Sequence, residues 1–151
     1  MASDTATAPF RSRRLVRLAD CDPVGVVYFP RYFDLFHGLI EDWFGQGLGL
    51  DYWRLLREDG LAFPVAHAEA DYRASSRMGE TLDLELRIER LGERSLTLRI
   101  DVSGAVDGAV RVKGRLVTVA TDLASGRSVP IPEDLRAVFR RYVGRCGREV
   151  A

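Results

Sequence analysis

Two aspartates, Asp20 and Asp22, stand on either side of a cysteine in a segment that also carries a glycine and two prolines, residues 20–30. This composition is typical of a structured turn. A carboxylate held in such a turn can act as a nucleophile or as a general base. It can also make only turn and cap hydrogen bonds ahead of a helix, and two aspartates taken alone favour that structural role.

Other kinds of catalytic machinery are absent from the sequence. There is no Gly-x-Ser-x-Gly elbow and no phosphate-binding Gly-x-x-x-x-Gly-Lys-Ser/Thr segment, and the two histidines are His37 and His67. His37 and Glu41 have the i, i+4 spacing of two metal ligands on a helix, but a catalytic zinc normally takes three protein ligands. We therefore predict that the protein uses no metal and no other cofactor.

The composition argues against several classes of partner. Lysine and arginine total 22, and aspartate and glutamate also total 22, so no basic excess is available to bind a nucleic acid. No apolar stretch approaches the roughly 20 residues of a membrane span, and we predict no membrane association. The two cysteines, Cys21 and Cys146, do not form the spaced framework of a secreted or zinc-binding protein, which favours a reducing cytoplasm.

The chain of 151 residues has the length of one domain. We predict a disordered N-terminal tail over residues 1–10, a single domain over residues 11–145 and a C-terminal tail over residues 146–151. The first strand is expected over residues 11–18.

Three helices are expected from the spacing of apolar residues. The longest should run from about Pro30 to Phe44, because its apolar residues recur on one helical face. These residues are Tyr32, Leu35, Phe36, Leu39, Ile40, Trp43 and Phe44. A shorter helix is expected over residues 51–59, capped by Asp51, and a closing helix over residues 133–143.

From Leu61 onward the apolar period changes to two, which predicts half-buried antiparallel strands. The alternation is plainest in Leu82, Leu84, Leu86 and Ile88, and again in Leu96, Leu98, Ile100 and Val102. Gly92-Glu93 and Asp107-Gly108 are expected to form the tight turns of consecutive hairpins. In the last strand the apolar parity switches around Gly114, which predicts a bulge or bend there.

One long helix after a first strand, followed by four antiparallel strands, predicts an α+β domain in which the sheet curls around that helix. A five-stranded sheet leaves its edge strands open, so pairing between copies through an edge is physically sensible.

The segment around the two aspartates also carries a resemblance. Its thirteen residues are Asp20-Cys-Asp-Pro-Val-Gly-Val-Val-Tyr-Phe-Pro-Arg-Tyr32. They resemble the signature Asp-x-Asp-x-x-Gly-x-Val-Tyr/Trp-x-x-x-Tyr of the 4-hydroxybenzoyl-CoA thioesterase family, and a weaker resemblance extends from Arg14 to about Tyr142. The resemblance implies the hotdog fold, a five-stranded antiparallel sheet wrapped around one long helix. It also implies hydrolysis of an acyl-CoA and assembly as a homodimer or as a homotetramer built from two dimers.

The resemblance implies that Asp22 is the catalytic carboxylate, acting on the thioester carbonyl as nucleophile or general base, with Asp20 as its structural partner. Hydrolysis develops negative charge on the carbonyl oxygen, and a helix N-terminus offers free N–H groups to stabilise it. The backbone N–H of Phe29, or failing that of Tyr28, is the candidate donor. Pro30 has no N–H to offer.

Several side chains are candidates for substrate binding. Arg73, Arg77 and Arg94 are candidates to bind the CoA phosphates. Arg94 falls in the hairpin turn where the resembling family has a basic cluster, whereas this chain reads Gly92-Glu93-Arg94. Tyr28, Tyr32, Phe33 and Phe36 could line a flat pocket, which favours an aromatic or medium-length acyl group. His37 lies one helical turn beyond Phe33 and is a candidate contact for a polar ring substituent. The 4-hydroxybenzoyl, benzoyl, phenylacetyl and short aliphatic groups all remain open.

Two other functions remain as alternatives to hydrolysis. One is a non-hydrolytic hotdog module that binds an acyl ligand or an acyl-carrier protein. The other is a hotdog dehydratase, which normally pairs a catalytic histidine with an acid, and neither histidine of this chain lies in such a motif.

Overall fold

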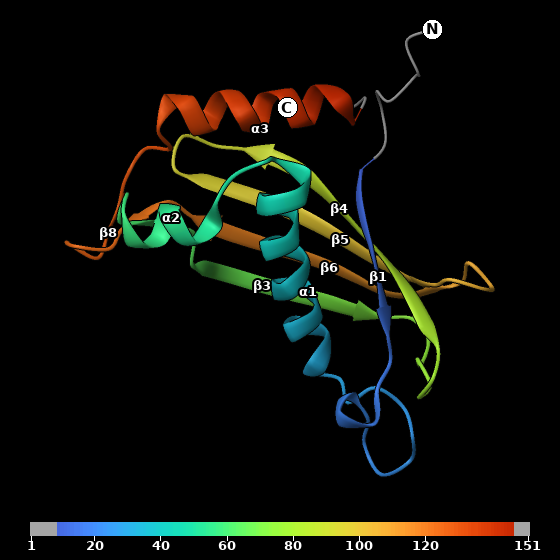
Figure 1. The fold of residues 1–151 in the computed structure, drawn as a ribbon. Helices are drawn as coiled ribbons and strands as arrows, with labels where there is room; N and C mark the ends of the chain where they lie inside the picture. The colour runs from blue at the N-terminus through green and yellow to red at the C-terminus, as the bar shows by residue number, and fades with distance from the viewer. Residues whose placement is uncertain (1–8, 147–151) are drawn as a thin grey trace, which may run out of the picture.

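A five-stranded antiparallel sheet wraps around a single long helix, α1 (Arg31–Asp42), in the computed structural model (Figure 1). The structure describes residues 9–146, so most of both predicted tails lies outside the described residues. The strand order is β1-β4-β5-β6-β3, with every neighbouring pair antiparallel. The strands are β1 (Phe10–Leu15), β3 (Val65–Tyr72), β4 (Thr81–Leu91), β5 (Ser95–Gly104) and β6 (Val110–Val119). The predicted α+β hotdog fold is confirmed.

Smaller elements complete the domain. A 3₁₀ turn η1 (Leu18–Asp20) follows β1, and the first strand is shorter than the predicted 11–18 and starts one residue earlier. A second small sheet has the order β2-β7-β8. The remaining elements are η2 (Trp43–Gly47), α2 (Tyr52–Arg57), β2 (Leu61–Ala62), β7 (Thr121–Asp122), β8 (Arg127–Ser128) and α3 (Glu133–Arg145). Of the helices in the described part of the chain, none is long and apolar enough to cross a membrane.

The alternating pattern of the sequence forms β4 and β5 as predicted. The apolar residues of both strands are buried on the face toward α1, and the intervening polar side chains point to the opposite face. The turn between β5 and β6 contains Gly108 with φ 67°, the left-handed conformation that an Asp-Gly turn requires.

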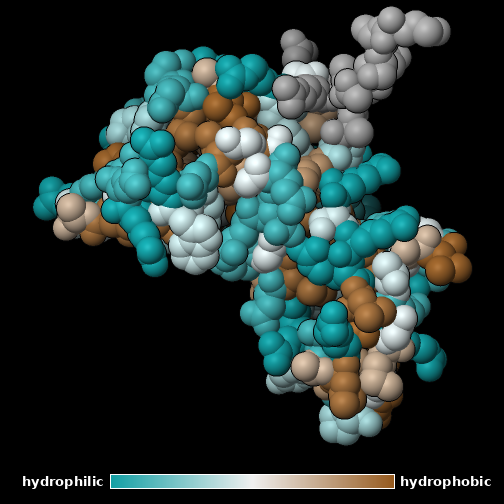
Figure 2. Space-filling model, in the orientation of Figure 1, coloured by the Kyte–Doolittle hydropathy of each residue, from teal (hydrophilic) through white to brown (hydrophobic). Residues whose placement is uncertain are grey.

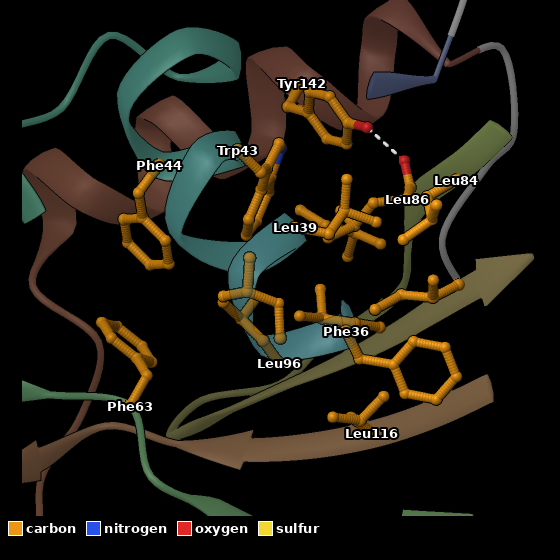
Figure 3. Packing of buried hydrophobic residues seen from close by; sticks show 14 of the residues in the cluster. Phe36, Leu39, Trp43, Phe44, Phe63, Leu84, Leu86, Leu96, Leu116 and Tyr142 are labelled. Carbon is orange, nitrogen blue, oxygen red and sulfur yellow. Dashed lines mark hydrogen bonds between the residues drawn. The ribbon is translucent and has the colours of Figure 1, made fainter. Parts of the chain in front are cut away.

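Helix α1 buries one stripe of side chains on the sheet. Pro30 is its N-cap residue, and Tyr32, Phe36, Leu39 and Ile40 are its buried residues. Beyond Asp42 the helix widens into the single π turn of η2, which buries Trp43 and Phe44 almost completely. The close packing of these aromatic rings with the leucines of the sheet forms the centre of the core (Figure 3).

The closing helix α3 lies beside β4 at one end of the sheet (Figure 1). Its Phe139 stacks on Trp43 with ring centroids 5.8 Å apart. The hydroxyl of Tyr142 donates to the carbonyl of Leu86 in β4 (Figure 3) and accepts from the N–H of Phe10 in β1 at 2.8 Å. Burial raises the pKa of the Tyr142 phenol far above its usual range, so this hydroxyl stays a donor. It ties α3 to two neighbouring strands.

The predicted bulge at Gly114 is wrong. β6 pairs with β5 without interruption from Val112 to Val119, and the irregularity falls opposite Val102 and Ser103, next to Arg111. Gly114 keeps the inward parity of its strand, and its lack of a side chain makes room for Phe36. A Cβ built on Gly114 would lie 2.7 Å from two carbons of the Phe36 ring. Val117 and Val119, the apolar residues that suggested a switch, lie on the outer face of the sheet.

We predict that Gly114→Ala lowers the free energy of unfolding by about 1–3 kcal/mol, because the added methyl group overpacks against Phe36. Urea denaturation measures the change. Gly144→Ala in α3 is the matched control, since nothing beyond its own stretch of helix lies within 4 Å of its Cβ position, and it should be no less stable than the parent. A Gly114→Ala protein as stable as the parent would contradict the contact.

Candidate active site

The two aspartates lie in a small hairpin between η1 and α1. Cys21 pairs with Val27 across this hairpin, and the Asp22 N–H donates to the Val26 carbonyl at 2.8 Å. Gly25 turns the chain at its tip with φ 82°. The hairpin projects from the sheet, and apolar surface gathers on it (Figure 2).

The side chain of Asp22 uses one oxygen to hold the hairpin. Its Oδ1 accepts from the N–H of Val24 at 3.0 Å and from the N–H of Val26 at 3.4 Å. Its Oδ2 has no hydrogen-bond partner among residues 9–146. Asp22 can therefore stabilise the turn with Oδ1 and still have Oδ2 available for chemistry.

Asp20 has two structural contacts. Its carboxylate accepts from the Arg17 N–H at 2.9 Å, which caps η1. Its carbonyl accepts from the Tyr28 N–H at 2.9 Å. This second bond occupies the Tyr28 amide, so that amide has no proton left for a substrate.

The Phe29 amide is the one that remains free. Its N–H has no acceptor within the described part of the chain. The Tyr28 carbonyl of the same peptide group accepts from the Arg31 N–H at 2.8 Å, in the first turn of α1. Because the peptide is trans, the Phe29 N–H points the opposite way, out of the N-terminal end of the helix. There it adds to the positive end of the helix dipole.

A segment after β3, residues 73–80, supports the hairpin. The Val27 N–H donates to the Ser76 carbonyl at 2.9 Å, and the Met78 N–H donates to the Gly25 carbonyl at 3.1 Å. Arg77 forms a β-bridge with Val26, so its side chain starts beside the hairpin. Arg77, a candidate phosphate-binding residue from the sequence, thus borders the candidate site.

A buried arginine, Arg111, and its acidic partners hold this supporting segment in place. Glu80 accepts from the Arg77 N–H at 2.7 Å with one oxygen and from the buried Arg111 guanidinium at 3.0 Å with the other. Arg111 also donates to Asp107 at 2.8 Å. The Asp107 hydrogen bond raises the pKa of Arg111, and the same bond lowers the pKa of the Asp107 carboxyl. Both groups therefore stay ionised at neutral pH.

An open groove of about 340 Å³ lies beside the start of α1. Phe29, Tyr32 and Arg73, all candidates from the sequence, line it together with Val27, Tyr72, Ala74 and Ser75. Arg73 forms a surface ion pair with Asp71 at 3.7 Å.

Tyr72 is a groove residue that the sequence analysis missed. Its hydroxyl donates to the Phe29 carbonyl at 2.9 Å. The only signal for it was an aromatic residue at a strand end, next to the candidate Arg73.

Tyr32 contributes mainly to packing. It is buried, and its hydroxyl donates to the Oγ of Ser76 at 2.8 Å, a residue with no exposed surface. Burial raises the pKa of the Tyr32 phenol, so it remains protonated and donates this bond. Its ring lies edge-on to Tyr72, with centroids 5.7 Å apart.

Two predicted substrate contacts lie away from this groove in the single chain. His37 is exposed on α1 and pairs its Nε2 with Glu41 Oε1 at 2.9 Å. Arg94 lies in the β4–β5 hairpin, at the opposite end of the sheet from the Asp22 hairpin (Figure 1), and donates to the Ser128 carbonyl at 2.8 Å. Within the described residues, no group of three or more His, Cys, Asp or Glu side chains is placed to hold a metal ion.

Comparison with known proteins identifies the family. Residues 16–139 match the model of the thioesterase-like superfamily. The chain belongs to this superfamily. It is 29% identical over 130 residues to a 1,4-dihydroxy-2-naphthoyl-CoA hydrolase of Acaryochloris marina (strain MBIC 11017), covering 85% of this chain and 94% of that protein. It is 31% identical to a hydrolase of the same name from Synechococcus sp. (strain CC9605), covering 80% of this chain and 82% of that protein.

A solved structure supports the fold. The crystal structure of a 1,4-dihydroxy-2-naphthoyl-CoA thioesterase from Synechocystis superposes with a TM-score of 0.79 at 24% identity, covering 87% of this chain and 95% of that one. The predicted enzyme class, a thioester hydrolase, is confirmed.

We predict that Ser76→Ala lowers the free energy of unfolding by about 1–3 kcal/mol, because it leaves the buried Tyr32 hydroxyl without a partner. Adding Tyr32→Phe should recover part of this loss, since both partners of the bond are then gone. Denaturant unfolding of the two single variants and the double variant measures the coupling. Ser75→Ala, at the exposed neighbouring serine, is the control with no expected change. If the double variant lost as much free energy of unfolding as the two single variants together, the hydrogen bond between Tyr32 and Ser76 would be contradicted.

Proposed function

We propose that this enzyme hydrolyses an aromatic acyl-CoA to the free acid and CoA, with Asp22 as the reacting carboxylate and the Phe29 N–H as the oxyanion donor. The observation that carries the proposal is that two groups in the segment leading into α1 make no hydrogen bond within residues 9–146. One is the Oδ2 of Asp22, and the other is the backbone N–H of Phe29. Both belong to the segment that resembles the 4-hydroxybenzoyl-CoA thioesterase signature.

The chemistry of a thioester suits these two groups. Charge that develops on the carbonyl oxygen is stabilised by the Phe29 N–H and by the helix dipole behind it. Asp22 either attacks the carbonyl carbon or takes a proton from the attacking water. In both routes the carbon–sulfur bond breaks, CoA leaves as its thiol, and one water is consumed per thioester.

The groove supports an aromatic acyl group. Three of its lining residues, Phe29, Tyr32 and Tyr72, are aromatic, and flat rings pack favourably against one another. The two relatives described above are named for a bicyclic aromatic acyl-CoA. Arg73 and Arg77 stand at the groove and beside the hairpin, where their charges could pair with the CoA phosphates.

We further propose assembly as a homodimer or as a homotetramer of two dimers. β3 is an edge strand that pairs only with β6 in the described chain, and most of its residues are exposed. An open edge of this kind is a ready partner for a second copy.

A panel of acyl-CoAs tests the substrate class. The panel contains benzoyl-, 4-hydroxybenzoyl-, 1,4-dihydroxy-2-naphthoyl- and phenylacetyl-CoA together with straight-chain acyl-CoAs, and released thiol is measured. We expect kcat/KM for the best aromatic substrate to exceed that of every straight-chain one by at least about tenfold. Faster hydrolysis of a straight-chain substrate would contradict the aromatic class, and no thiol release from any member would contradict hydrolysis of CoA thioesters.

We predict that Asp22→Asn lowers kcat by at least about a hundredfold, because it removes the carboxylate from the thioester carbonyl. The fold should persist, since the amide oxygen of asparagine can still accept from the Val24 and Val26 N–H groups. Turnover and thermal unfolding are measured on the same preparations. Asp20→Asn is the matched control and should reduce turnover much less. Near wild-type turnover in Asp22→Asn would rule out its proposed role.

A further inference from the structure

Phe29 is largely exposed, so packing contributes little to fixing its position, although its proposed role requires an accurately placed amide. The residue is 59% exposed. Its carbonyl accepts a long hydrogen bond of 3.4 Å from the Tyr32 N–H and a shorter one of 2.9 Å from the Tyr72 hydroxyl. In residues 9–146, this is the single side-chain hydrogen bond made to the backbone of residues 28–30. The position of Phe29 therefore depends largely on hydrogen bonds.

Tyr72 is itself well anchored. It is the last residue of the edge strand β3 and is paired with Val112 of β6. Its ring contacts the rings of Tyr32 and Phe29 edge-on, at centroid distances of 5.7 and 6.1 Å. Tyr32 is in turn buried and bonded to Ser76. The position of the Tyr72 hydroxyl is thus set by the pairing of β3 with β6 and by these ring contacts.

The two peptide groups of Phe29 are held from different sides. The first carries the free N–H, and its Tyr28 carbonyl is bonded to the first turn of α1. The second carries the carbonyl that accepts from Tyr72. Because peptide groups are planar, fixing both of them leaves the φ and ψ angles of Phe29 little freedom. Phe29 also precedes Pro30, and the proline ring further narrows the φ and ψ angles that the preceding residue can adopt.

We propose that Tyr72 is a positioning residue for the oxyanion donor, acting through its hydrogen bond to the Phe29 carbonyl. This inference rests on the proposed function of the Asp22 hairpin. A donor held in place before the reaction stabilises developing charge more than one that must reorganise. Burial raises the pKa of the Tyr72 phenol, which keeps the hydroxyl protonated and able to donate.

We predict that Tyr72→Phe, which keeps the ring and removes the hydroxyl, lowers kcat by about tenfold and changes KM for an aromatic acyl-CoA less than about twofold. Steady-state kinetics on the best substrate of the panel measures both. Tyr142→Phe is the control, since it also removes a hydroxyl bonded to the backbone but lies in α3, away from the hairpin. It should lower thermal stability and leave kcat unchanged. An unchanged kcat in Tyr72→Phe would overturn the inference.

A spectroscopic measurement separates positioning from a merely structural role. The carbonyl stretch of an aromatic acyl-CoA labelled with ¹³C at the thioester carbon is recorded bound to Asp22→Asn, and then bound to Asp22→Asn/Tyr72→Phe. We expect the bound carbonyl to be shifted from its value in water in the first protein and to move back toward that value in the second. Equal frequencies in the two proteins would overturn the positioning role even if kcat fell.

The same measurement distinguishes failure of the inference from failure of the proposed function. If the Asp22→Asn protein binds the labelled thioester without any shift of its carbonyl stretch, the Phe29 amide is not the oxyanion donor. That result would reject the proposed site and the role of Tyr72 together. A clear shift that Tyr72→Phe leaves unchanged would reject only the role of Tyr72.

Discussion

The position of α1 on the sheet depends on one close contact, between the ring of Phe36 and the backbone of Gly114. A side chain at position 114 would occupy the space that the ring takes. Phe36 has no exposed surface, and the leucines of β4 and β5 surround the same face of the helix. Because side chains in a core pack at crystal-like density, this contact limits how far the helix can move along or away from the sheet. The N-terminal end of α1 is placed as a consequence, and with it the Phe29 N–H, which has no acceptor among residues 9–146.

The hairpin that precedes α1 is held by hydrogen bonds far more than by burial. Asp22 closes it from inside with one carboxylate oxygen, and residues 73–80 close it from outside through backbone bonds. Glu80 and the buried Arg111 then tie that outer segment to the sheet. Such an arrangement leaves the side of the hairpin that carries the proposed reactive groups open to solvent while its backbone is held by hydrogen bonds. It also explains why apolar residues such as Val24 can remain on its surface.

Most of the fold could be predicted from the sequence, and the failures have a common cause. The periods of 3.6 and 2 located α1, β4 and β5, because these patterns arise from local geometry that each segment carries with it. The bulge predicted at Gly114 was wrong because the apolar residues beyond it, Val117 and Val119, lie on the outer face of an unbroken strand, while Gly114 makes room on the inner face for Phe36 from another element. Of the candidate site residues, the structure gathers Phe29, Tyr32 and Arg73 around one groove. It places Arg94 at the far end of the sheet in the same chain.

The sequence by itself determined the order of the main elements, the acidic turn ahead of the long helix and the resemblance that pointed to a thioester. These features depend on residues close together in the sequence, so they can be recognised without knowledge of the packing. Only the tertiary structure decided which amide lacks an acceptor in the described part of the chain, because the Tyr28 N–H donates to the carbonyl of Asp20. It also decided that Tyr72 lies against Phe29, 43 residues earlier in the chain. Contacts of this kind depend on the relative positions of β3, residues 73–80 and α1. No local pattern in the sequence predicts those positions.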